Sequence, residues 1–302
     1  MNRRWKRRIL ITLAILMVLF TIGGYVGFHY IAPYAITQPG RVSLDLKPSE
    51  LDLKSTSLDL EIADSIRLKG YSIESNLETT RGIMILVHGV GGCKEHFIPL
   101  AGDLADLGVA TLVFDGRAHG KSSGDFCTYG FHEKKDIARL VDYIKTRNDS
   151  LPVGIWGNSL GGAIALQALE YDERIQFGVI ESTFTDLRTI VHDYKKRMLG
   201  GFGIRSLSNY ALDRAGEVAN FDPSQVAPIE SVKHIEQPVL IAHGNEDERI
   251  SFEYGKALFE NLKSVDKEFV EVEGGKHFGM FDVGGQAYKE KLLTFIERNL
   301  RE

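Results

Sequence analysis

The sequence predicts an α/β protein whose mostly parallel sheet is covered by helices on both faces, with a small inserted cap and one preceding transmembrane helix. Three observations predict this class. Short unbroken apolar runs alternate with segments of helical spacing, as right-handed βαβ crossovers require. The alternation is interrupted between residues 183 and 228, and an uncharged apolar run at residues 9–32 precedes the whole pattern.

The N-terminal segment has the length and flanks of a membrane anchor. Residues 9–32 contain no Lys, Arg, Asp or Glu, and a helix of this length extends about 36 Å, enough to cross a hydrocarbon core of about 30 Å. A cleaved secretory signal is the alternative, but its apolar core is usually shorter, and Pro33 follows the nearest small residue, Ala32. We therefore expect an uncleaved anchor.

Charge predicts how the anchor is oriented and which partners are excluded. Residues 1–8 form a basic tail, whereas only Arg41 follows the apolar run closely, which predicts a cytoplasmic N-terminus and a domain on the outer, periplasmic or extracellular, side. The net charge of the chain is −5 in spite of this tail, so the remainder is more acidic still. An acidic body argues against nucleic acid as a partner.

Residues 33–54 mix Pro, Ser, Asp and Lys and are interpreted as a stalk that leads into a domain at residues 55–302. The region 183–228 contains a basic cluster and a glycine-rich turn and is interpreted as the cap. Periodicity predicts the remaining elements. Strands are expected at 66–73, 83–87, 109–114, 153–156, 177–180, 239–242 and 268–272, and helices at 94–107, 134–147, 160–169, 254–262 and 286–299.

A Gly-x-Ser-x-Gly motif, Gly157 to Gly161 with Ser159 at its centre, lies between a predicted strand and a predicted helix. This is the context of a nucleophile elbow, a sharp turn that raises a serine hydroxyl above the sheet. The glycines avoid a collision around the turn. The following helix directs its N-terminus toward the negative charge that develops during acyl transfer. We interpret Ser159 as the nucleophile.

A serine nucleophile needs a histidine base oriented by a carboxylate, and in this arrangement the chain order is serine, acid, histidine. Asp247 lies in the loop after the strand at 239–242 and is preferred as the acid over its neighbours Glu246 and Glu248. His277 lies in a glycine-flanked loop after the last strand and is expected to be the base.

Two backbone N–H groups are expected to form an oxyanion hole. One belongs to Leu160, directly after the nucleophile, and the other to Val90, in the glycine-rich loop after the strand at 83–87. The neighbouring His88 is expected to shape this loop through its ring nitrogens rather than to act as a base.

No cofactor or metal is expected. The sequence lacks the spacing of a zinc motif, and no glycine-rich stretch has the full Gly-x-x-x-x-Gly-Lys-Ser/Thr pattern of a phosphate loop. Cys93 and Cys127 are the two cysteines. One disulfide between them and two buried thiols both remain open, since pairing is not readable from sequence.

Five motifs in order resemble the α/β-hydrolase superfamily, above all the serine aminopeptidase-like and Bem46-like hydrolases, many of which are membrane-anchored. They begin at His88, Asp115, Gly157, His243 and Gly275, and the resemblance covers about residues 55–300. It implies a triad of Ser159, Asp247 and His277 with Val90 and Leu160 as oxyanion donors. It also implies a structural role for the segment from Asp115 to Ser122, in which Ala118 replaces the usual first glycine.

The predicted function is hydrolysis of a carboxylic ester or related acyl bond through an acyl-enzyme intermediate. The substrate is expected to be a small or lipid-like acyl compound. A serine peptidase or aminopeptidase and a catalytically silent binding module with the same fold are the alternatives, because fold membership does not select a substrate.

Overall fold

The computed structural model describes residues 3–63 and 66–300. It contains one eight-stranded sheet with the strand order β1-β2-β4-β3-β5-β6-β7-β8. The first two pairs in this order, β1 with β2 and β2 with β4, are antiparallel. All later pairs are parallel. The strands are β1 (Ser55–Ala63), β2 (Ile66–Ile73), β3 (Gly82–Val87), β4 (Val109–Phe114), β5 (Val153–Asn158), β6 (Ile175–Glu181), β7 (Val239–Gly244) and β8 (Lys267–Val272).

The described helices comprise an N-terminal pair, a set that covers the sheet and a set that forms the cap. A π-helical turn, Gly27–Ile31, joins the N-terminal pair. The helices are α1 (Arg3–Val26), α2 (Ala32–Thr37), α3 (Ile98–Asp106), α4 (Glu133–Lys145), α5 (Leu160–Tyr171), α6 (Leu187–Met198), α7 (Arg205–Ala219), α8 (Pro228–Ser231), α9 (Phe252–Asn261) and α10 (Met280–Asn299).

The predicted mostly parallel, doubly covered sheet is confirmed. All residues of β3 and β7 are buried, which is why these strands read as unbroken apolar runs. One core cluster packs α4, α5 and α9 on one face of the sheet, and a second packs α3 and α10 on the other. Every strand and covering helix expected from periodicity is present within a few residues, although α10 begins earlier and is broken at Gly285. The antiparallel edge strand β1 was not predicted.

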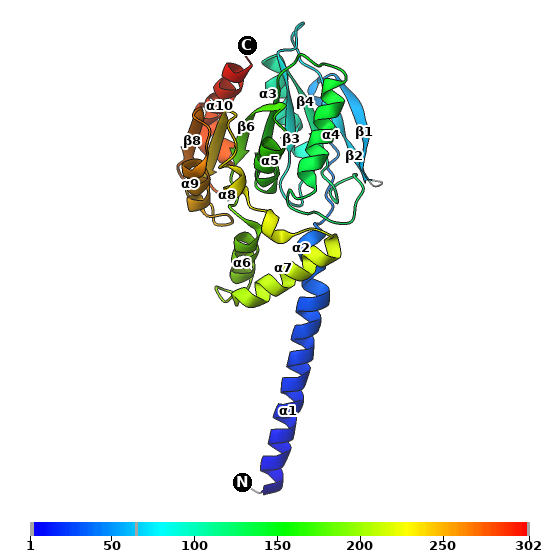
Figure 1. Cartoon of the computed structure of the whole chain (residues 1–302), viewed down its shortest axis with the longest axis vertical. Helices are drawn as coiled ribbons and strands as arrows, with labels where there is room; N and C mark the ends of the chain where they lie inside the picture. Colours follow the sequence, from blue (N-terminus) through cyan, green and yellow to red (C-terminus); the bar gives the residue numbers. More distant parts are fainter. Residues whose placement is uncertain (1–2, 64–65, 301–302) are drawn as a thin grey trace.

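The cap consists of α6 and α7 and lies between the sheet domain and α1, which projects alone from the molecule (Figure 1). The cap follows β6, so it covers the carboxyl edge of the parallel strands. The helix Arg3–Thr37 is long and apolar enough to cross a membrane, and its most apolar window is not buried by the protein. The predicted N-terminal apolar helix is therefore present.

The segment expected to form a stalk is held against the domain. Residues 33–37 continue the N-terminal helix, and the side chains of Pro33 and Thr37 are buried. The guanidinium group of Arg41 then donates hydrogen bonds to backbone carbonyls between His119 and Gly124. This part of the segment is therefore packed against the domain, because Pro33 and Thr37 are buried and Arg41 is hydrogen-bonded to the domain's backbone.

The middle of the sheet has no space for a side chain at Gly154 of β5. A Cβ atom there would lie 2.4 Å from both the sulfur of Met84 and Cζ of Phe177. We expect Gly154→Ala to lower the free energy of unfolding by about 1–3 kcal/mol, the usual cost of overpacking a core. Urea unfolding of the full chain in detergent micelles would measure it. Gly40→Ala is the control, because no atom lies within 4 Å of its Cβ position, and equal midpoints for the two variants would contradict the prediction.

Candidate active site

Ser159 occupies a strained turn between β5 and α5, with φ 54° and ψ −120°. The backbone N–H of Ser159 donates to the carbonyl of Glu181, and the Ser159 carbonyl accepts from the hydroxyl of Thr183 at 2.7 Å. A Cβ at Gly157 would lie 2.1 Å from the Gly161 carbonyl oxygen, and a Cβ at Gly161 would lie 1.9 Å from that of Val87. The two glycines therefore allow the helix to begin directly against the ends of the strands.

The structure brings together the three side chains selected from the sequence. The Ser159 hydroxyl lies 3.1 Å from Nε2 of His277, and Nδ1 of His277 lies 2.7 Å from Oδ2 of Asp247. Because an ionised carboxylate can only accept, Nδ1 carries the ring proton, and Nε2 is the acceptor for the serine hydroxyl. This is the arrangement that a general base requires before the serine attacks.

Asp247 is held by more donors than the sequence indicated. Its Oδ1 accepts from the backbone N–H groups of Arg249 and Ile250, at 2.8 and 2.9 Å. The ring of His243, buried completely in β7, approaches Oδ2 at 3.5 Å. Burial alone would raise the pKa of Asp247, but the hydrogen bonds from His243, His277 and Ile250 outweigh it and hold this pKa well below its ordinary value.

His243 is a site residue that the sequence analysis did not select. Its Nε2 donates to the carbonyl of Ile250 at 3.0 Å, so it supports the loop that carries Asp247. Its place in the strand just before that loop, four residues from Asp247, was the available signal. The sequence position alone did not identify His243 as a site residue, because a histidine in an apolar strand is equally typical of a side chain that only packs in the core.

The two predicted oxyanion donors, Leu160 and Val90, are both near Ser159. Leu160 begins α5 directly after Ser159, and Val90 and Ser159 line the same cavities. Within residues 3–63 and 66–300, neither the Val90 nor the Leu160 N–H donates to a protein acceptor. Two amide donors beside a serine hydroxyl are thus unpaired and able to receive a substrate oxygen. Their catalytic role stays a prediction.

His88 shapes the glycine-rich loop as expected. Nδ1 donates to the Gly89 carbonyl at 2.8 Å, and Nε2 accepts from the Gly116 N–H at 3.0 Å. Burial, with the ring of His119 nearby, lowers the pKa of His88 to about 4. The ring is therefore neutral at physiological pH, and both of its nitrogens are occupied.

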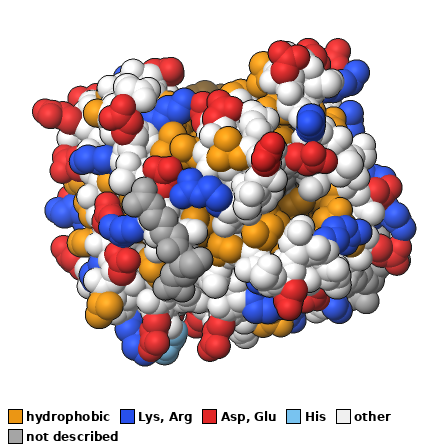
Figure 2. All heavy atoms as spheres, turned by 90° about the horizontal axis from the view of Figure 1, so that it is seen from above, with side chains coloured by type: hydrophobic (Ala, Val, Ile, Leu, Met, Phe, Trp, Pro, Cys, Tyr) orange, Lys and Arg blue, Asp and Glu red, His pale blue; other side chains and the backbone are white. Residues whose placement is uncertain are grey.

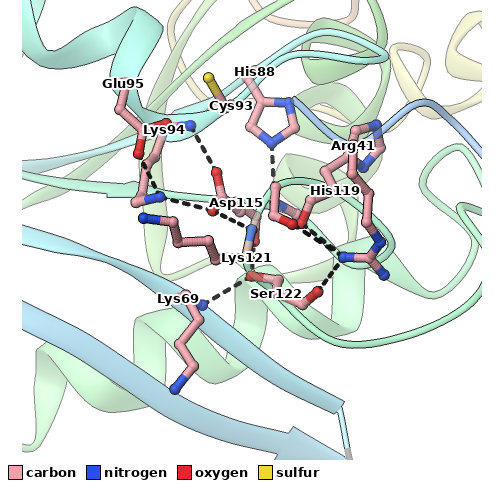
Figure 3. Close-up of polar contacts among 12 residues, drawn as sticks. Arg41, Lys69, His88, Cys93, Lys94, Glu95, Asp115, His119, Lys121 and Ser122 are labelled. Atoms are coloured by element: carbon pink, nitrogen blue, oxygen red, sulfur yellow. Dashed lines mark hydrogen bonds and ion pairs between the residues drawn. The ribbon is translucent and has the colours of Figure 1, made fainter. Parts of the chain in front are cut away.

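A buried ionic network ties this loop to the segment that follows β4 (Figure 3). The Asp115 carboxylate accepts from the backbone N–H and the ammonium group of Lys94, both at 2.9 Å, and from the Lys121 N–H at 2.8 Å. Lys94 also pairs with Glu95 at 2.7 Å. Burial alone would lower the pKa of Lys94, but the hydrogen bonds with Glu95 and Asp115 raise it. The network keeps the loop of Val90 in place.

The backbone at Ala118 explains the glycine usual at this position in the resembling proteins. Ala118 has φ 61°, a left-handed conformation that costs roughly 1–2 kcal/mol for a residue with a Cβ atom. The Ala118 N–H donates to the Ser123 carbonyl, and the Ser122 hydroxyl donates to the Asp115 carbonyl. Closing this tight loop by hydrogen bonds compensates for the strained residue.

Two cavities meet at Ser159. One has a volume of about 710 Å³ and is lined by His88, Asn158 and His277, with several charged groups farther out. The other has a volume of about 520 Å³, extends beneath the cap and is lined almost entirely by apolar side chains. The hydroxyl of Ser159 thus lies between a cavity with a mixed polar and apolar lining and an apolar cavity.

The structure offers no metal site near the serine. Among the described residues, no group of three or more His, Cys, Asp or Glu side chains is placed to hold a metal ion. Cys93 and Cys127 are both buried free thiols, so they are not bridged. Burial raises the pKa of both thiols, to about 11 for Cys93.

Comparison with known proteins finds related sequences and related folds. The family model described as serine aminopeptidase, S33, matches residues 78–211. The uncharacterized protein YqkD of Bacillus subtilis is 24% identical over 84% of this chain and 83% of its own length. The lysophosphatidylserine lipase ABHD12 of Macaca fascicularis is 28% identical over 62% of this chain and 46% of its own length. The solved structure of a Pyrococcus furiosus esterase superposes with a TM-score of 0.72 at 21% identity, covering 87% of this chain and 98% of that one.

The lowered pKa of Asp247 predicts a pH dependence of stability. A folded-state pKa below that of the unfolded chain, about 3.9 for Asp, contributes stability that is fully present above about pH 4. That contribution is lost as the pH falls from there through the folded-state pKa. We expect Asp247→Asn to remove it, so that the variant loses less free energy of unfolding than the wild type between about pH 5 and about pH 3.

Urea unfolding at a series of pH values would measure this difference. Asp45→Asn, at an exposed position, is the matched control. Its free energy of unfolding should change with pH as steeply as that of the wild type. Parallel slopes for Asp247→Asn and wild type would show that Asp247 does not contribute in this way.

Proposed function

Because the chain belongs to the α/β-hydrolase superfamily, we propose that it is a serine hydrolase in which Ser159 is the nucleophile, His277 the base and Asp247 the orienting acid. The observation that carries the proposal is the continuous hydrogen-bond chain from the Ser159 hydroxyl through His277 to Asp247. The strained turn at Ser159 supports it further, since such strain persists where the surroundings enforce it and is concentrated at functional sites.

The proposed reaction is acyl transfer to water. Oγ of Ser159 attacks the carbonyl carbon of the substrate while Nε2 of His277 takes the hydroxyl proton. The tetrahedral oxyanion accepts hydrogen bonds from the Val90 and Leu160 N–H groups. Its collapse breaks the bond to the leaving group, which takes the proton from His277. Water then attacks the acyl-enzyme while His277 takes its proton. Collapse of this second tetrahedral intermediate breaks the bond to Oγ of Ser159, which takes the proton back from His277, and the acid is released.

Asp247 has two tasks in this scheme. Its hydrogen bond keeps the His277 proton on Nδ1, which leaves Nε2 free to accept from serine. Its lowered pKa keeps it ionised, so its negative charge stabilises the imidazolium that forms. His243 and the backbone N–H groups of Arg249 and Ile250 are positioning groups, because they hold Asp247 without facing the substrate.

We propose a carboxylic ester as the substrate rather than a peptide. The apolar cavity beside Ser159 fits an acyl group and offers little to bind a peptide backbone. A Pyrococcus furiosus esterase and a lysophosphatidylserine lipase among the similar proteins support this choice. A panel of esters, thioesters and aminoacyl amides would compare the two classes directly.

We also propose that the N-terminal helix anchors the protein with its N-terminus in the cytoplasm and its domain on the outer side. Five basic residues lie in the tail at residues 3–8. Such residues are retained on the cytoplasmic side of a membrane.

Replacing the proposed nucleophile should abolish turnover. We expect Ser159→Ala to lower kcat for p-nitrophenyl butyrate by about a thousandfold or more, while circular dichroism and the unfolding midpoint stay close to those of the wild type. A fluorophosphonate probe should label wild type at Ser159 and leave the variant unlabelled. Ser150→Ala, at an exposed turn, is the control, and undiminished turnover by Ser159→Ala would refute the assignment.

Membrane orientation is testable with a maleimide that does not cross membranes. Both natural cysteines are buried, so an introduced cysteine should dominate the labelling. We expect Asn148→Cys, at an exposed position just after α4, to be labelled on intact cells and Lys6→Cys only after permeabilisation. The reverse pattern would contradict the proposed orientation.

A further inference from the structure

The apolar cavity beside Ser159 is walled in part by the membrane anchor. Phe28, Ala32, Ala35 and Ile36 line it from the outer end of the N-terminal helix, opposite side chains from the cap helices α6 and α7. An anchor that served only as a tether would not need to contribute side chains to a cavity that contains the nucleophile. The anchor's end is part of the site.

The cavity leads from the nucleophile to the surface beside the anchor. At its inner end Ser159, Leu160 and Ile250 are buried. At its outer end the lining residues Met198 and Leu199 are 83% and 57% exposed. The increase in side-chain exposure from one end of the lining to the other indicates an apolar passage. One end lies at Ser159, and the other lies at the junction between the cap and the anchor.

Specific contacts hold the end of the anchor in place. Nδ1 of His29 lies 2.6 Å from the hydroxyl of Tyr210 in α7, and the hydroxyl of Tyr129 donates to the Ile36 carbonyl at 2.6 Å. The Cys127 N–H donates to the Thr37 carbonyl at 2.8 Å. The Lys195 ammonium group lies 4.2 Å from the centre of the Phe28 ring. The anchor-side wall is therefore fixed to both the cap and the sheet domain.

The outer end of the passage is at the level of the membrane surface. The uncharged run begins at Ile9, and a hydrocarbon core of about 30 Å takes about twenty helical residues, so it ends near Phe28, where Tyr25 and Tyr30 supply aromatic residues for the boundary. Phe28 follows Tyr25 within one turn. The last turn of α6 and the loop before α7 place exposed apolar side chains beside basic residues, a pattern typical of membrane-surface contact. The exposed apolar side chains are Met198, Leu199, Phe202 and Ile204, and the basic residues are Lys195, Lys196 and Arg197.

The opposite face of the molecule has a different surface. Seen from the side away from the anchor, acidic and basic side chains are interspersed over the sheet domain (Figure 2). Such a mixed charged surface is suited to water. The cap therefore faces the bilayer and the charged face points away from it.

We propose that this cavity, the anchor-walled pocket, binds the long acyl chain of an ester that is drawn from the adjacent bilayer. The inference rests on the proposed function for its chemistry at Ser159 and adds the substrate class. The acyl chain lies between the anchor and the cap, and the ester carbonyl reaches Ser159. The cavity of mixed lining on the other side of Ser159, which includes the Lys289–Asp103 ion pair, receives the alcohol part.

The test measures chain-length preference with the full-length protein in lipid nanodiscs. Wild-type kcat/KM should rise about tenfold or more from p-nitrophenyl butyrate to p-nitrophenyl decanoate, because each methylene buried in an apolar pocket contributes a factor of up to about four. Ala35→Trp fills the pocket from the anchor side and should lower the decanoate-to-butyrate ratio at least about fivefold. Ala14→Trp makes the same exchange in α1, outside the pocket, and should keep the wild-type ratio.

A ratio in Ala35→Trp equal to that of Ala14→Trp would overturn the anchor-walled pocket while leaving the nucleophile assignment intact. A wild type that hydrolyses no ester and is not labelled by fluorophosphonate would instead overturn the proposed function. The two failures are therefore distinguishable.

A binding measurement tests the pocket without any turnover. A fatty acid with a terminal diazirine, photolysed with Ser159→Ala in nanodiscs, should cross-link to peptides that contain residues 28–36 and 190–211. Excess unlabelled palmitate should suppress these cross-links but not those along the lipid-facing part of α1. Cross-links that palmitate does not suppress at either peptide would contradict specific acyl binding.

Discussion

The contact on which the site depends is the close approach of the first turn of α5 to the ends of β3 and β5. The Gly161 Cβ position lies 1.9 Å from the Val87 carbonyl oxygen, so only a glycine permits this approach. It forces Ser159 into a strained conformation with positive φ, and Thr183 and Glu181 secure that conformation through hydrogen bonds to the Ser159 backbone. The serine hydroxyl thereby stands at the carboxyl edge of the sheet, with the helix N-terminus beneath the place where negative charge would develop.

The loops around the serine are held by buried polar groups rather than by apolar packing alone. The Asp247 carboxylate accepts from three donors with the His243 ring close by, and the Asp115–Lys94–Glu95 network lies almost wholly out of water. A buried ion pair adds little net stability, but removing one partner leaves an uncompensated charge that costs about 3–5 kcal/mol. These networks therefore specify loop geometry. The neutral His88, hydrogen-bonded through both nitrogens, does the same for the loop that carries Val90.

The site and the anchor lie on the same side of the molecule. The cap follows β6, so it covers the carboxyl edge of the sheet where Ser159, Asp247 and His277 meet. The N-terminal helix runs into that cap and packs against α7 through its outer end (Figure 1). Under the membrane anchoring proposed above, Ser159 faces the bilayer, so the proposed ester substrate would reach it from the membrane rather than from bulk water.

The sequence determined the parallel strands, the helices that cover them and the position of the Gly-x-Ser-x-Gly turn, because these depend on local patterns. An unbroken apolar run such as residues 83–87 requires two covered faces, and Gly-x-Ser-x-Gly between a strand and a helix has few other uses. The chain order of serine, acid and histidine then pointed to Asp247 and His277. Parallel strands place their carboxyl ends along one edge, so the loops after them were expected to meet.

Only the tertiary structure decided the role of His243, the state of the two cysteines and the path of residues 28–41. Each depends on contacts between segments far apart in the chain, such as His29 with Tyr210 or Arg41 with the carbonyls after His119. An apolar helix has the same sequence pattern whether its side chains face lipid or line a cavity. Hydrophobic burial is non-directional, so pattern alone cannot distinguish an anchor that only crosses a membrane from one whose outer end also completes a pocket.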